Sequence, residues 1–207
     1  ERILVRRWHA FLFMQARVIR RLHHVITVSE RSRQDIARDF RRPVARTDLI
    51  YNGIDTDVFR PLEGVERPTR RLMATASADA PLKGLRYLLK AYAALLADFP
   101  DLELVVIGRP QPGGKTERLL ARLDLQERVR FVSGVSTEEL VRLYARATIA
   151  VVPSLYEGFG LPAGEAMACE VPVVSSDGGA LPEIVGAAGV IVPAADAGAL
   201  QRAIAEL

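Results

Sequence analysis

Six short runs of almost uninterrupted apolar residues are spread through the part of this chain after residue 70. They read RLMATA, LELVVIG, VRFV, IAVVP, VPVVSS and GVIVP. Strands of a parallel sheet are covered on both faces and are apolar throughout, whereas strands with one solvated face alternate. Helical segments are predicted between these runs at residues 85–98, 116–123, 137–145, 162–169 and 181–185. The pattern predicts an α/β fold, with a doubly wound, Rossmann-like sheet of six parallel strands.

The first part of the chain follows a different pattern. ERILVRRWHAFLFMQARVIRRL predicts a helix with an apolar stripe, and HVITVS predicts a short strand. Ser29 is the expected N-cap of a second helix that extends to about Phe40. Asn52-Gly53 and Pro61 then interrupt the regular pattern, so we place a domain boundary near Phe59. Residues 1–58 and 59–207 are the two predicted domains.

Both ends of the sequence lie inside helical patterns. The chain opens on Glu1 rather than on methionine, and it stops within LQRAIAEL. We therefore expect an excerpt of a longer protein. The opening helix-strand-helix is then the end of one domain, and the six-stranded part is a second domain.

Composition restricts the classes of protein that this chain can belong to. Hydrophobic residues make up 49% and charged residues 26% of the 207, which is ordinary for a globular protein with a core. Apolar runs stay well short of the ~18 residues that span a bilayer, so we expect no transmembrane helix. A single cysteine, Cys169, suits a reducing compartment, and we expect a cytoplasmic protein. His9, His23 and His24 have no ligand-like neighbours, so we expect no metal site.

The net charge of +3 conceals two unequal parts. Residues 1–46 carry twelve arginines against four acids, and the remainder carries sixteen basic residues against twenty-one acids. The acidic second part disfavours nucleic acid as a partner. The basic opening helix, with Trp8, Phe11 and Phe13 beside its arginines, has two interpretations. We favour packing on further parts of its own domain; the alternative is peripheral contact with an anionic membrane, for example the inner face of the cell membrane.

One strand-to-helix loop carries most of the chemistry. In PSLYEGFGLPAGEAMACEVPVV, seven residues separate Glu157 from Glu165. Gly158 and Gly160 allow a ligand to approach the backbone, and Pro162 suits the first turn of the helix that follows. The start of a helix favours an anion such as a diphosphate. Because carboxylates repel anions, the two glutamates are expected to face hydroxyl groups, as a nucleotide sugar would supply.

The segment PSLYEGFGLPAGEAMACEVPVVSSDGGALPEIVG closely resembles the E-x7-E signature of the retaining nucleotide-sugar glycosyltransferases, the group 1 family with the two-domain GT-B fold. Further segments resemble the same family: HHVITVSERSRQDI, IYNGIDTDVFRP, PLKGLRYLLKAYAALL and VRFVSGVSTEELVRLYARATIAVVPS. The resemblance implies the end of the acceptor-binding domain followed by the C-terminal, donor-binding half of a GT-B enzyme.

The resemblance also implies a role for each matching residue. Glu157 would contact hydroxyls of the transferred sugar, and Glu165 would hold the ribose. Lys83 would neutralise the diphosphate as the nucleotide leaves. Val135 would lie beside the base. Backbone groups along the donor would come from Gly158, Phe159, Gly160 and Leu161.

This sequence departs from the family pattern at three positions. Ala78 stands where the family commonly has an arginine, five residues before Lys83. Arg86 and Arg109 are candidates to replace that arginine. Glu170 and Ser133 occupy positions where glycine is frequent, which is expected to affect the local backbone rather than the chemistry.

Two nucleotide-binding motifs are absent or imperfect. GRPQPGGKTERLL follows a strand and opens a helix, but five residues rather than four separate Gly108 from the Gly114-Lys115-Thr116 run. We therefore do not expect a P-loop. No G-x-G-x-x-G follows the first strand of the α/β domain, which disfavours a nicotinamide or flavin dinucleotide.

The sequence thus predicts the donor half of a retaining, metal-independent glycosyltransferase that needs no cofactor. Its expected ligands are a UDP-, GDP- or ADP-sugar and a sugar or lipid-linked acceptor. This chain alone is expected to bind the donor nucleotide without transferring sugar. Two rival hypotheses remain, a non-catalytic nucleotide-sugar-binding subunit and a nucleotide-sugar epimerase of the same fold.

Overall fold

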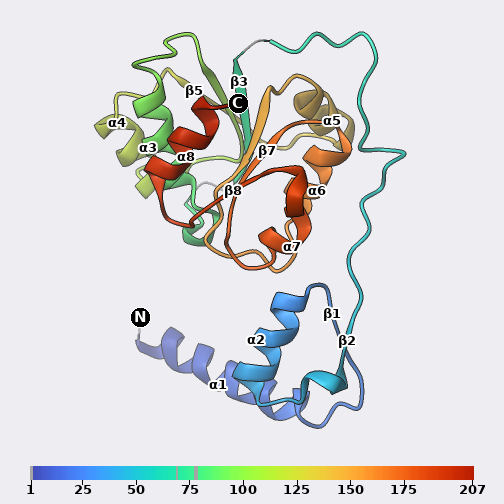
Figure 1. The fold of residues 1–207 in the computed structure, drawn as a ribbon. Helices are drawn as coiled ribbons and strands as arrows, with labels where there is room; N and C mark the ends of the chain where they lie inside the picture. The colour runs from blue at the N-terminus through green and yellow to red at the C-terminus, as the bar shows by residue number, and fades with distance from the viewer. Residues whose placement is uncertain (1, 69, 77–78) are drawn as a thin grey trace. The chain divides into compact units, whose positions relative to one another are not determined.

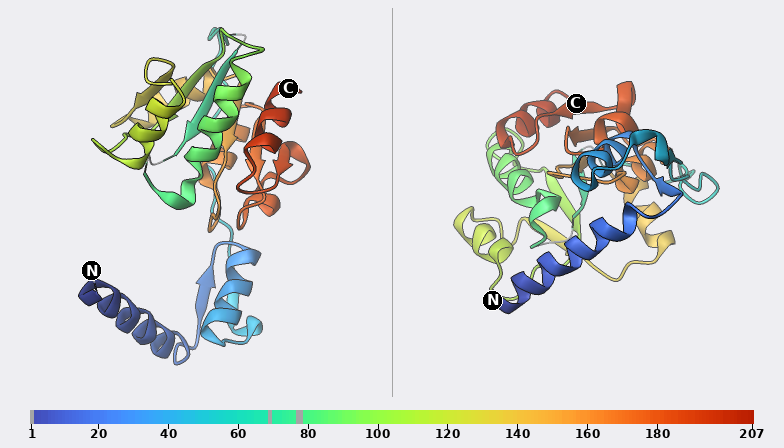
Figure 2. Two further views of the ribbon diagram at one scale, coloured as in Figure 1. Left: turned by 90° about the vertical axis from the view of Figure 1, so that its left-hand side faces the viewer. Right: turned by 90° about the horizontal axis from the view of Figure 1, so that it is seen from below.

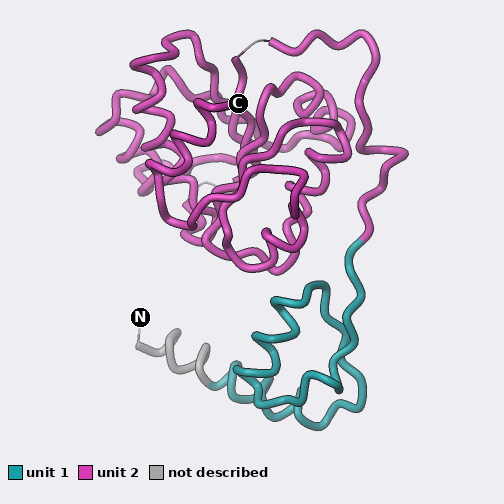
Figure 3. Tube along the Cα trace, viewed as in Figure 1, with its two compact units in different colours: residues 1–52 teal, residues 53–207 magenta. Residues whose placement is uncertain are grey.

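The computed structural model describes residues 2–68, 70–76 and 79–207, with side chains from residue 10 onward. The chain divides into two compact units, Glu1–Asn52 and Gly53–Leu207 (Figure 3). The boundary predicted near Phe59 falls within the second unit, in the extended segment that precedes its first strand.

The second unit is built on one parallel sheet of six strands. In chain order these are β3 (Arg71–Thr75), β4 (Glu103–Ile107), β5 (Val129–Val132), β6 (Ile149–Val152), β7 (Val173–Ser176) and β8 (Val190–Val192). They lie side by side in the order β5-β4-β3-β6-β7-β8, and every neighbouring pair is parallel. The predicted sheet is confirmed. Strand order reverses between β3 and β6, which is the switch point where such sheets bind ligands.

Helices cover both faces of this sheet (Figure 1). One face carries α3 (Leu85–Leu95), α4 (Lys115–Arg122) and α8 (Ala197–Ala205), which face the viewer in the left panel of Figure 2. The other carries α5 (Thr137–Ala145), α6 (Leu161–Ala168) and α7 (Leu181–Val185). The predicted helix at 85–98 ends earlier, at Leu95, because the N–H groups of Ala97 and Asp98 donate to carbonyls three residues back and so form a tighter turn.

Alternation along the strands divides the core into two clusters. Leu72, Val151 and Val174 pack with the helices of one face, whereas Met73, Ala150 and Val173 pack with those of the other. Because adjacent residues of a strand point to opposite faces, a strand covered twice must be apolar at every position. This explains the unbroken apolar runs of the sequence.

The first unit contains more strand than was predicted. Its elements are α1 (Arg2–Ile19), β1 (Val25–Thr27), α2 (Glu30–Phe40), the 3₁₀ helix η1 (Val44–Arg46) and β2 (Thr47–Leu49). β1 and β2 form a two-stranded parallel sheet. The predicted N-cap of α2 is confirmed, since the Ser29 hydroxyl accepts the N–H of Ser32 at 3.0 Å. The segment TDL has no apolar pattern, so sequence periodicity did not reveal β2.

A buried arginine joins the parts of the first unit. Arg42 is 3% exposed, and its Nη1 donates to the carbonyls of Ile19 at 2.8 Å and Leu22 at 2.9 Å. Its Nε donates to the hydroxyl of Thr47 at 3.2 Å. The last carbonyls of a helix have no partners within the helix and carry partial negative charge. Arg42 therefore closes the end of α1 and fastens it to β2.

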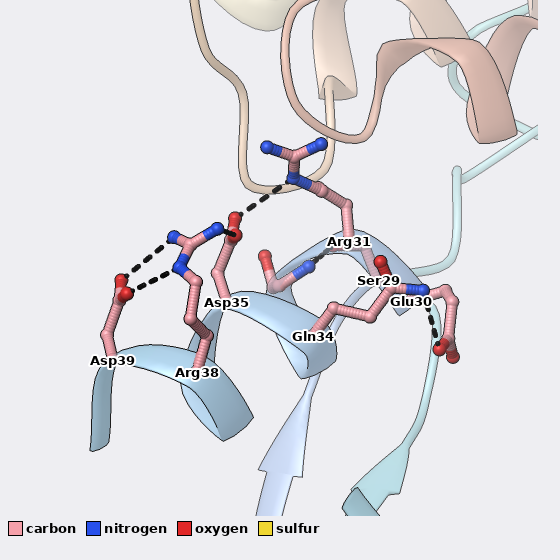
Figure 4. Close-up of polar contacts among 8 residues, drawn as sticks. Ser29, Glu30, Arg31, Gln34, Asp35, Arg38 and Asp39 are labelled. Atoms are coloured by element: carbon pink, nitrogen blue, oxygen red, sulfur yellow. Dashed lines mark hydrogen bonds and ion pairs between the residues drawn. The ribbon is translucent and has the colours of Figure 1, made fainter. Parts of the chain in front are cut away.

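Arg31 and Arg38 of α2 are paired with acids on the helix surface (Figure 4). Arg31 Nε lies 3.1 Å from Asp35, and Arg38 Nε lies 2.7 Å from Asp39. The Arg31–Asp35 pair, whose members are four residues apart on the helix, contributes about 0.3–0.5 kcal/mol. The excess of positive charge in this unit is thus partly neutralised locally.

Within the part of the chain that the structure describes, no helix combines the length and the apolar character needed to cross a membrane.

The end of α6 contains a strained glutamate, which yields a first prediction. Glu170 has φ 54°, and the N–H of Val171 that follows donates to Ala166 O at 3.0 Å, which closes the helix. A side chain in this left-handed geometry costs about 1–2 kcal/mol, partly offset by the greater freedom of glycine in the unfolded chain. We expect Glu170→Gly to raise the free energy of unfolding by about 0.5–1 kcal/mol in urea titrations followed by circular dichroism.

Glu170→Ala is the matched control because it keeps a Cβ in the same backbone geometry. It should give no comparable gain. Equal stabilisation by alanine and glycine would show that the glutamate side chain, and not its backbone conformation, is the source of the strain.

Candidate functional site

Two predicted residues meet at the switch point of the sheet. Lys83 lies in the short 3₁₀ helix η2 (Pro81–Lys83) that follows β3, and Glu157 lies in the loop that follows β6. The Lys83 Nζ is 2.8 Å from Glu157 Oε1. The structure therefore brings the expected diphosphate cation and the expected sugar-binding carboxylate into one ion pair.

A backbone contact holds the two loops together. The N–H of Leu155 donates to Leu82 O at 2.7 Å. Gly84 has φ +65°, and a Cβ built on it would lie 1.8 Å from Pro153 O. No side chain fits between these backbones, so glycine is required where α3 begins.

Two buried serines support Glu157 and were not among the predicted site residues. Ser154 is 1% exposed, and its hydroxyl donates to Glu157 Oε1 at 2.7 Å. Ser176, at the end of β7, donates its own hydroxyl to Ser154 O. The signal in the sequence was a hydroxyl residue at the carboxyl end of each of two apolar strands. That signal is too common to single out a site without the structure.

The loop after β7 fixes the backbone of Glu157 from the other side. The N–H of Glu157 donates to Gly178 O at 3.3 Å, and its carbonyl accepts the N–H of Ala180 at 2.9 Å. A Cβ at Gly179 would lie 2.3 Å from Glu157 O, so this contact also depends on glycine. Glu157 is consequently held between two loops rather than displayed on one.

Residues 158–161 lead from Glu157 into α6. Gly160 has φ +107° and is the N-cap of the helix, and a Cβ there would lie 2.7 Å from Leu181 Cδ2. Phe159 is 9% exposed, whereas Leu161 at the helix start is 41% exposed. Gly158 directly follows Glu157. The predicted glycine-rich helix start is present, with one glycine needed for close packing.

Glu165 lies in the second turn of α6 and contacts a buried tyrosine. Tyr144 on α5 is 1% exposed and donates its hydroxyl to Glu165 Oε2 at 3.2 Å. Burial raises the pKa of Glu165, although the Tyr144 hydrogen bond opposes this shift. Burial also raises the pKa of Tyr144, and the neighbouring Glu165 adds to the shift. The glutamate is thus partly desolvated and oriented by a neutral donor.

Arg67 closes the far ends of the same two helices. Its guanidinium donates to Cys169 O at 3.0 Å and Glu170 O at 2.8 Å after α6, and to Ala145 O at 3.3 Å at the end of α5. A cation is favourable at helix C-termini because the unpaired carbonyls there are partly negative. Arg67 thereby fixes the two helices that carry Tyr144 and Glu165. It comes from the extended segment, where no sequence pattern distinguished it from other arginines.

Val135 lines a groove beside β5. The groove has a volume of about 550 Å³ and is formed by the extended segment, β5 and α5. Leu62 and Val65 line it together with Val135, as do the arginines at 130, 142 and 146. Lys83, Glu157 and Glu165 are not among the described residues that form its walls.

The candidates to replace the family arginine do not contact that ion pair. Ala78 lies outside the described residues. Arg86 donates to the hydroxyl of Tyr87 at 2.6 Å and stacks over its ring at 4.6 Å. Arg109 is exposed just after β4. In the described part of the site, Lys83 is the cation that contacts Glu157.

The P-loop-like segment is filled by the chain's own carboxylate. Asp79 accepts the N–H of Gln111 at 2.9 Å and of Thr116 at 2.9 Å. Desolvation works to raise the pKa of Asp79, but these hydrogen bonds outweigh it and lower the pKa below its usual value. The N–H groups that would cradle a phosphate in a P-loop therefore bind Asp79.

Comparison with family models gives two matches. Residues 63–207 match the model described as "Glycosyl transferases group 1", and residues 2–58 match "Glycosyltransferase Family 4".

Several curated proteins are similar in sequence. An MMP alpha-(1->4)-mannosyltransferase of Mycolicibacterium hassiacum is 48% identical over 183 residues, which cover 88% of this chain and 44% of that protein. A D-inositol 3-phosphate glycosyltransferase of Mycobacterium sp. (strain KMS) is 37% identical over 169 residues, which cover 74% of this chain and 37% of that protein. The chain spans about half the length, or less, of the curated relatives it matches.

Solved structures share the fold. Sucrose-phosphate synthase from Thermosynechococcus elongatus superposes with a TM-score of 0.80 at 28% identity, covering 96% of this chain and 52% of that one. HepE from Anabaena in complex with UDP-glucose superposes with a TM-score of 0.81 at 23% identity, covering 94% of this chain and 57% of that one.

The contact between Gly84 and Pro153 yields a second prediction. In Gly84→Ala the new Cβ would clash with the carbonyl and occupy left-handed backbone geometry, so we expect a loss of roughly 2–4 kcal/mol in the free energy of unfolding. Gly64→Ala is the control: Gly64 has φ +73°, but nothing lies within 4 Å of the place that its new methyl group would take. If both variants lose the same stability in urea titrations, the close approach of the loops is not what makes Gly84 necessary.

Glu165 yields a third prediction through its raised pKa. At a pH above the usual pKa of glutamate, about 4.3, the unfolded carboxyl ionises freely while the folded one is disfavoured by burial. The charge of Glu165 therefore lowers stability at neutral pH, and this effect disappears as the pH falls below the unfolded pKa. We expect Glu165→Gln to be more stable than the wild type at pH 7.5 and the difference to shrink at pH 4 in urea unfolding. A difference that is the same at both pH values would contradict this assignment.

Proposed function

The chain belongs to the group 1 glycosyltransferases, and from that premise we propose that it supplies the donor-binding half of an enzyme that transfers a sugar from a nucleotide sugar to an acceptor hydroxyl with retention of configuration. The observation that carries this proposal is the meeting of Lys83 and Glu157, 2.8 Å apart, at the switch point of the sheet. A cation suits a diphosphate, and a carboxylate suits sugar hydroxyls. A nucleotide sugar presents both groups on adjoining parts of one molecule.

The proposed roles follow the polarity of the donor. Lys83 stabilises negative charge on the diphosphate as its bond to the sugar breaks, which is where a preorganised cation has most effect. The start of α6 adds partial positive charge, and residues 158–161 lie along the donor. Glu157 binds the transferred sugar, and Glu165 binds the ribose hydroxyls. The acceptor hydroxyl attacks the face from which the nucleotide leaves, and no metal is required.

Similar proteins support the nucleotide sugar as donor. The names of the related enzymes describe a mannosyltransferase and inositol phosphate glycosyltransferases, and HepE has been solved with UDP and with UDP-glucose. Because the chain spans about half of its relatives or less, we assign the acceptor-binding groups to parts of the protein outside it. We propose that this chain alone binds donor without transferring sugar.

The missing family arginine favours a second candidate function, that of a non-catalytic subunit. Ala78 replaces a common family arginine, and Arg86 is engaged with Tyr87. A non-catalytic subunit that binds nucleotide sugar would tolerate that loss, because it needs no stabilisation of a leaving group.

The proposal is tested by transfer and by binding. The intact protein is incubated with radiolabelled UDP-, GDP- and ADP-sugars and candidate acceptors, and a product that keeps the donor's anomeric configuration supports retaining transfer. Binding without turnover supports the non-catalytic subunit, and an isomerised sugar supports an epimerase. We expect Lys83→Ala to lower kcat/KM by roughly 10²–10³-fold. Lys90→Ala, which removes an exposed lysine of α3, is the control and should leave kcat/KM unchanged.

Glu165 is tested by calorimetry with UDP, GDP and ADP. One of these nucleotides should bind the wild type, and Glu165→Ala should bind it at least tenfold more weakly, since two hydroxyl contacts to a charged group are lost. Equal affinity of wild type and variant would remove Glu165 from the ribose site.

A further inference from the structure

Lys83 and Glu157 are partners in an ion pair at the switch point of the sheet. Lys83 Nζ donates to Glu157 Oε1, and the same oxygen accepts the Ser154 hydroxyl at 2.7 Å. The Lys83 side chain is 32% exposed, whereas that of Glu157 is 12% exposed. The residue proposed for the diphosphate and the residue proposed for the sugar therefore neutralise each other.

We propose that this pairing makes Glu157 a specificity-determining residue that favours the intact nucleotide sugar over the free nucleoside diphosphate. The inference rests on the proposed function, because it assigns the two ends of the donor to Lys83 and Glu157. Glu157 and the diphosphate compete for Lys83, because a diphosphate that binds Lys83 must first separate it from Glu157.

Only one member of the pair is free to move. Glu157 is held through its backbone by Gly178 and Ala180 and through its carboxylate by Ser154. Lys83 has a long flexible side chain and is the more exposed partner. A diphosphate therefore draws Lys83 out, while Glu157 stays in place.

The consequences differ for the two ligands. A free nucleoside diphosphate takes Lys83 away from Glu157. The largely buried carboxylate then keeps the hydrogen bond from Ser154 but has lost its ion pair. Leaving a buried charge without its counter-ion is unfavourable. An intact nucleotide sugar brings hydroxyl donors to the same carboxylate, so the lost ion pair is replaced by hydrogen bonds. The site thus penalises the spent nucleotide and not the donor.

The decisive variant is Glu157→Gln, which frees Lys83 without changing the size of the side chain. We expect the nucleoside diphosphate to bind this variant roughly five- to tenfold more tightly than the wild type. We expect the nucleotide sugar to bind no more tightly than before. The dissociation constant of the nucleoside diphosphate divided by that of the nucleotide sugar, both measured by calorimetry on the intact protein, should therefore fall by at least fivefold.

A double-mutant cycle with Lys83→Gln shows whether the gain acts through the lysine. On the Lys83→Gln background, Glu157→Gln should give no gain in diphosphate affinity. Asp177→Asn removes one negative charge from the same edge of the sheet, where Asp177 accepts the N–H of Ala194 at 2.7 Å. This control should change diphosphate affinity by less than twofold, which separates the ion pair from general electrostatics.

The titrations use UDP, GDP and ADP, and the nucleotide that binds is compared with its glucose and mannose derivatives. Equal diphosphate affinity of wild type and Glu157→Gln would overturn the inference and leave the proposed function standing. A gain that persists without Lys83, or that Asp177→Asn reproduces, would overturn it as well. If neither nucleotides nor nucleotide sugars bind the wild type, the proposed function fails, and the inference fails with it.

Discussion

The close approach of two backbones at the switch point is the constraint on which the site depends. Gly84 opens α3 against the carbonyl of Pro153, leaving no room for a Cβ. Because of this contact, the loops after β3 and β6 are joined, and their hydrogen bond from Leu155 to Leu82 can form. Lys83 and Glu157 are neighbours of these anchoring residues in the sequence. The ion pair is thus a consequence of backbone packing in the centre of a parallel sheet, where the strand order reverses between β3 and β6.

The helix α6 is fixed at both ends, and between them it carries Glu165, whose charged form is disfavoured by burial. Gly160 packs against Leu181 at its start, and Arg67 binds the carbonyls after its last turn. Between them Glu165 is partly desolvated beside Tyr144, with a raised pKa. A packed core that only had to be stable would not place a carboxylate there. Such local costs are typical of binding sites, where stability is lost so that a group is held ready for its ligand.

The fold could be predicted from the sequence because its cause is local and repeated. The central strands β3, β6 and β7 are covered on both faces, so their runs are apolar, and the sequence alone then locates the loops at the carboxyl ends of the strands. Lys83, Glu157 and Glu165 lie on such loops or the helix that follows, so their region of the fold was predictable. The supporting residues were not. Arg67 reaches the ends of α5 and α6 from far earlier in the chain, and Tyr144 has the pattern of an ordinary core residue. Arg42 is one of the twelve arginines of residues 1–46, and nothing in the sequence separated it from the others. It is buried among carbonyls, because only tertiary packing brings the end of α1 to it.

Two glycine-rich helix starts, those of α4 and α6, lie at the same edge of the sheet. They differ in where the neighbouring carboxylate is bound. At the start of α4, Asp79 accepts the backbone N–H groups of Gln111 and Thr116, so the partial positive charge there is neutralised within the chain. At the start of α6, the acid that precedes the glycines is Glu157, and its carboxylate is instead bound by Lys83 and Ser154. Glycine content and position after a strand are alike at the two sites. Whether a glycine-rich helix start is open to an anion therefore depends on where the neighbouring carboxylates are held, which a sequence motif does not encode. The lysine paired with Glu157 thus contributes to the electrostatic character of this helix start.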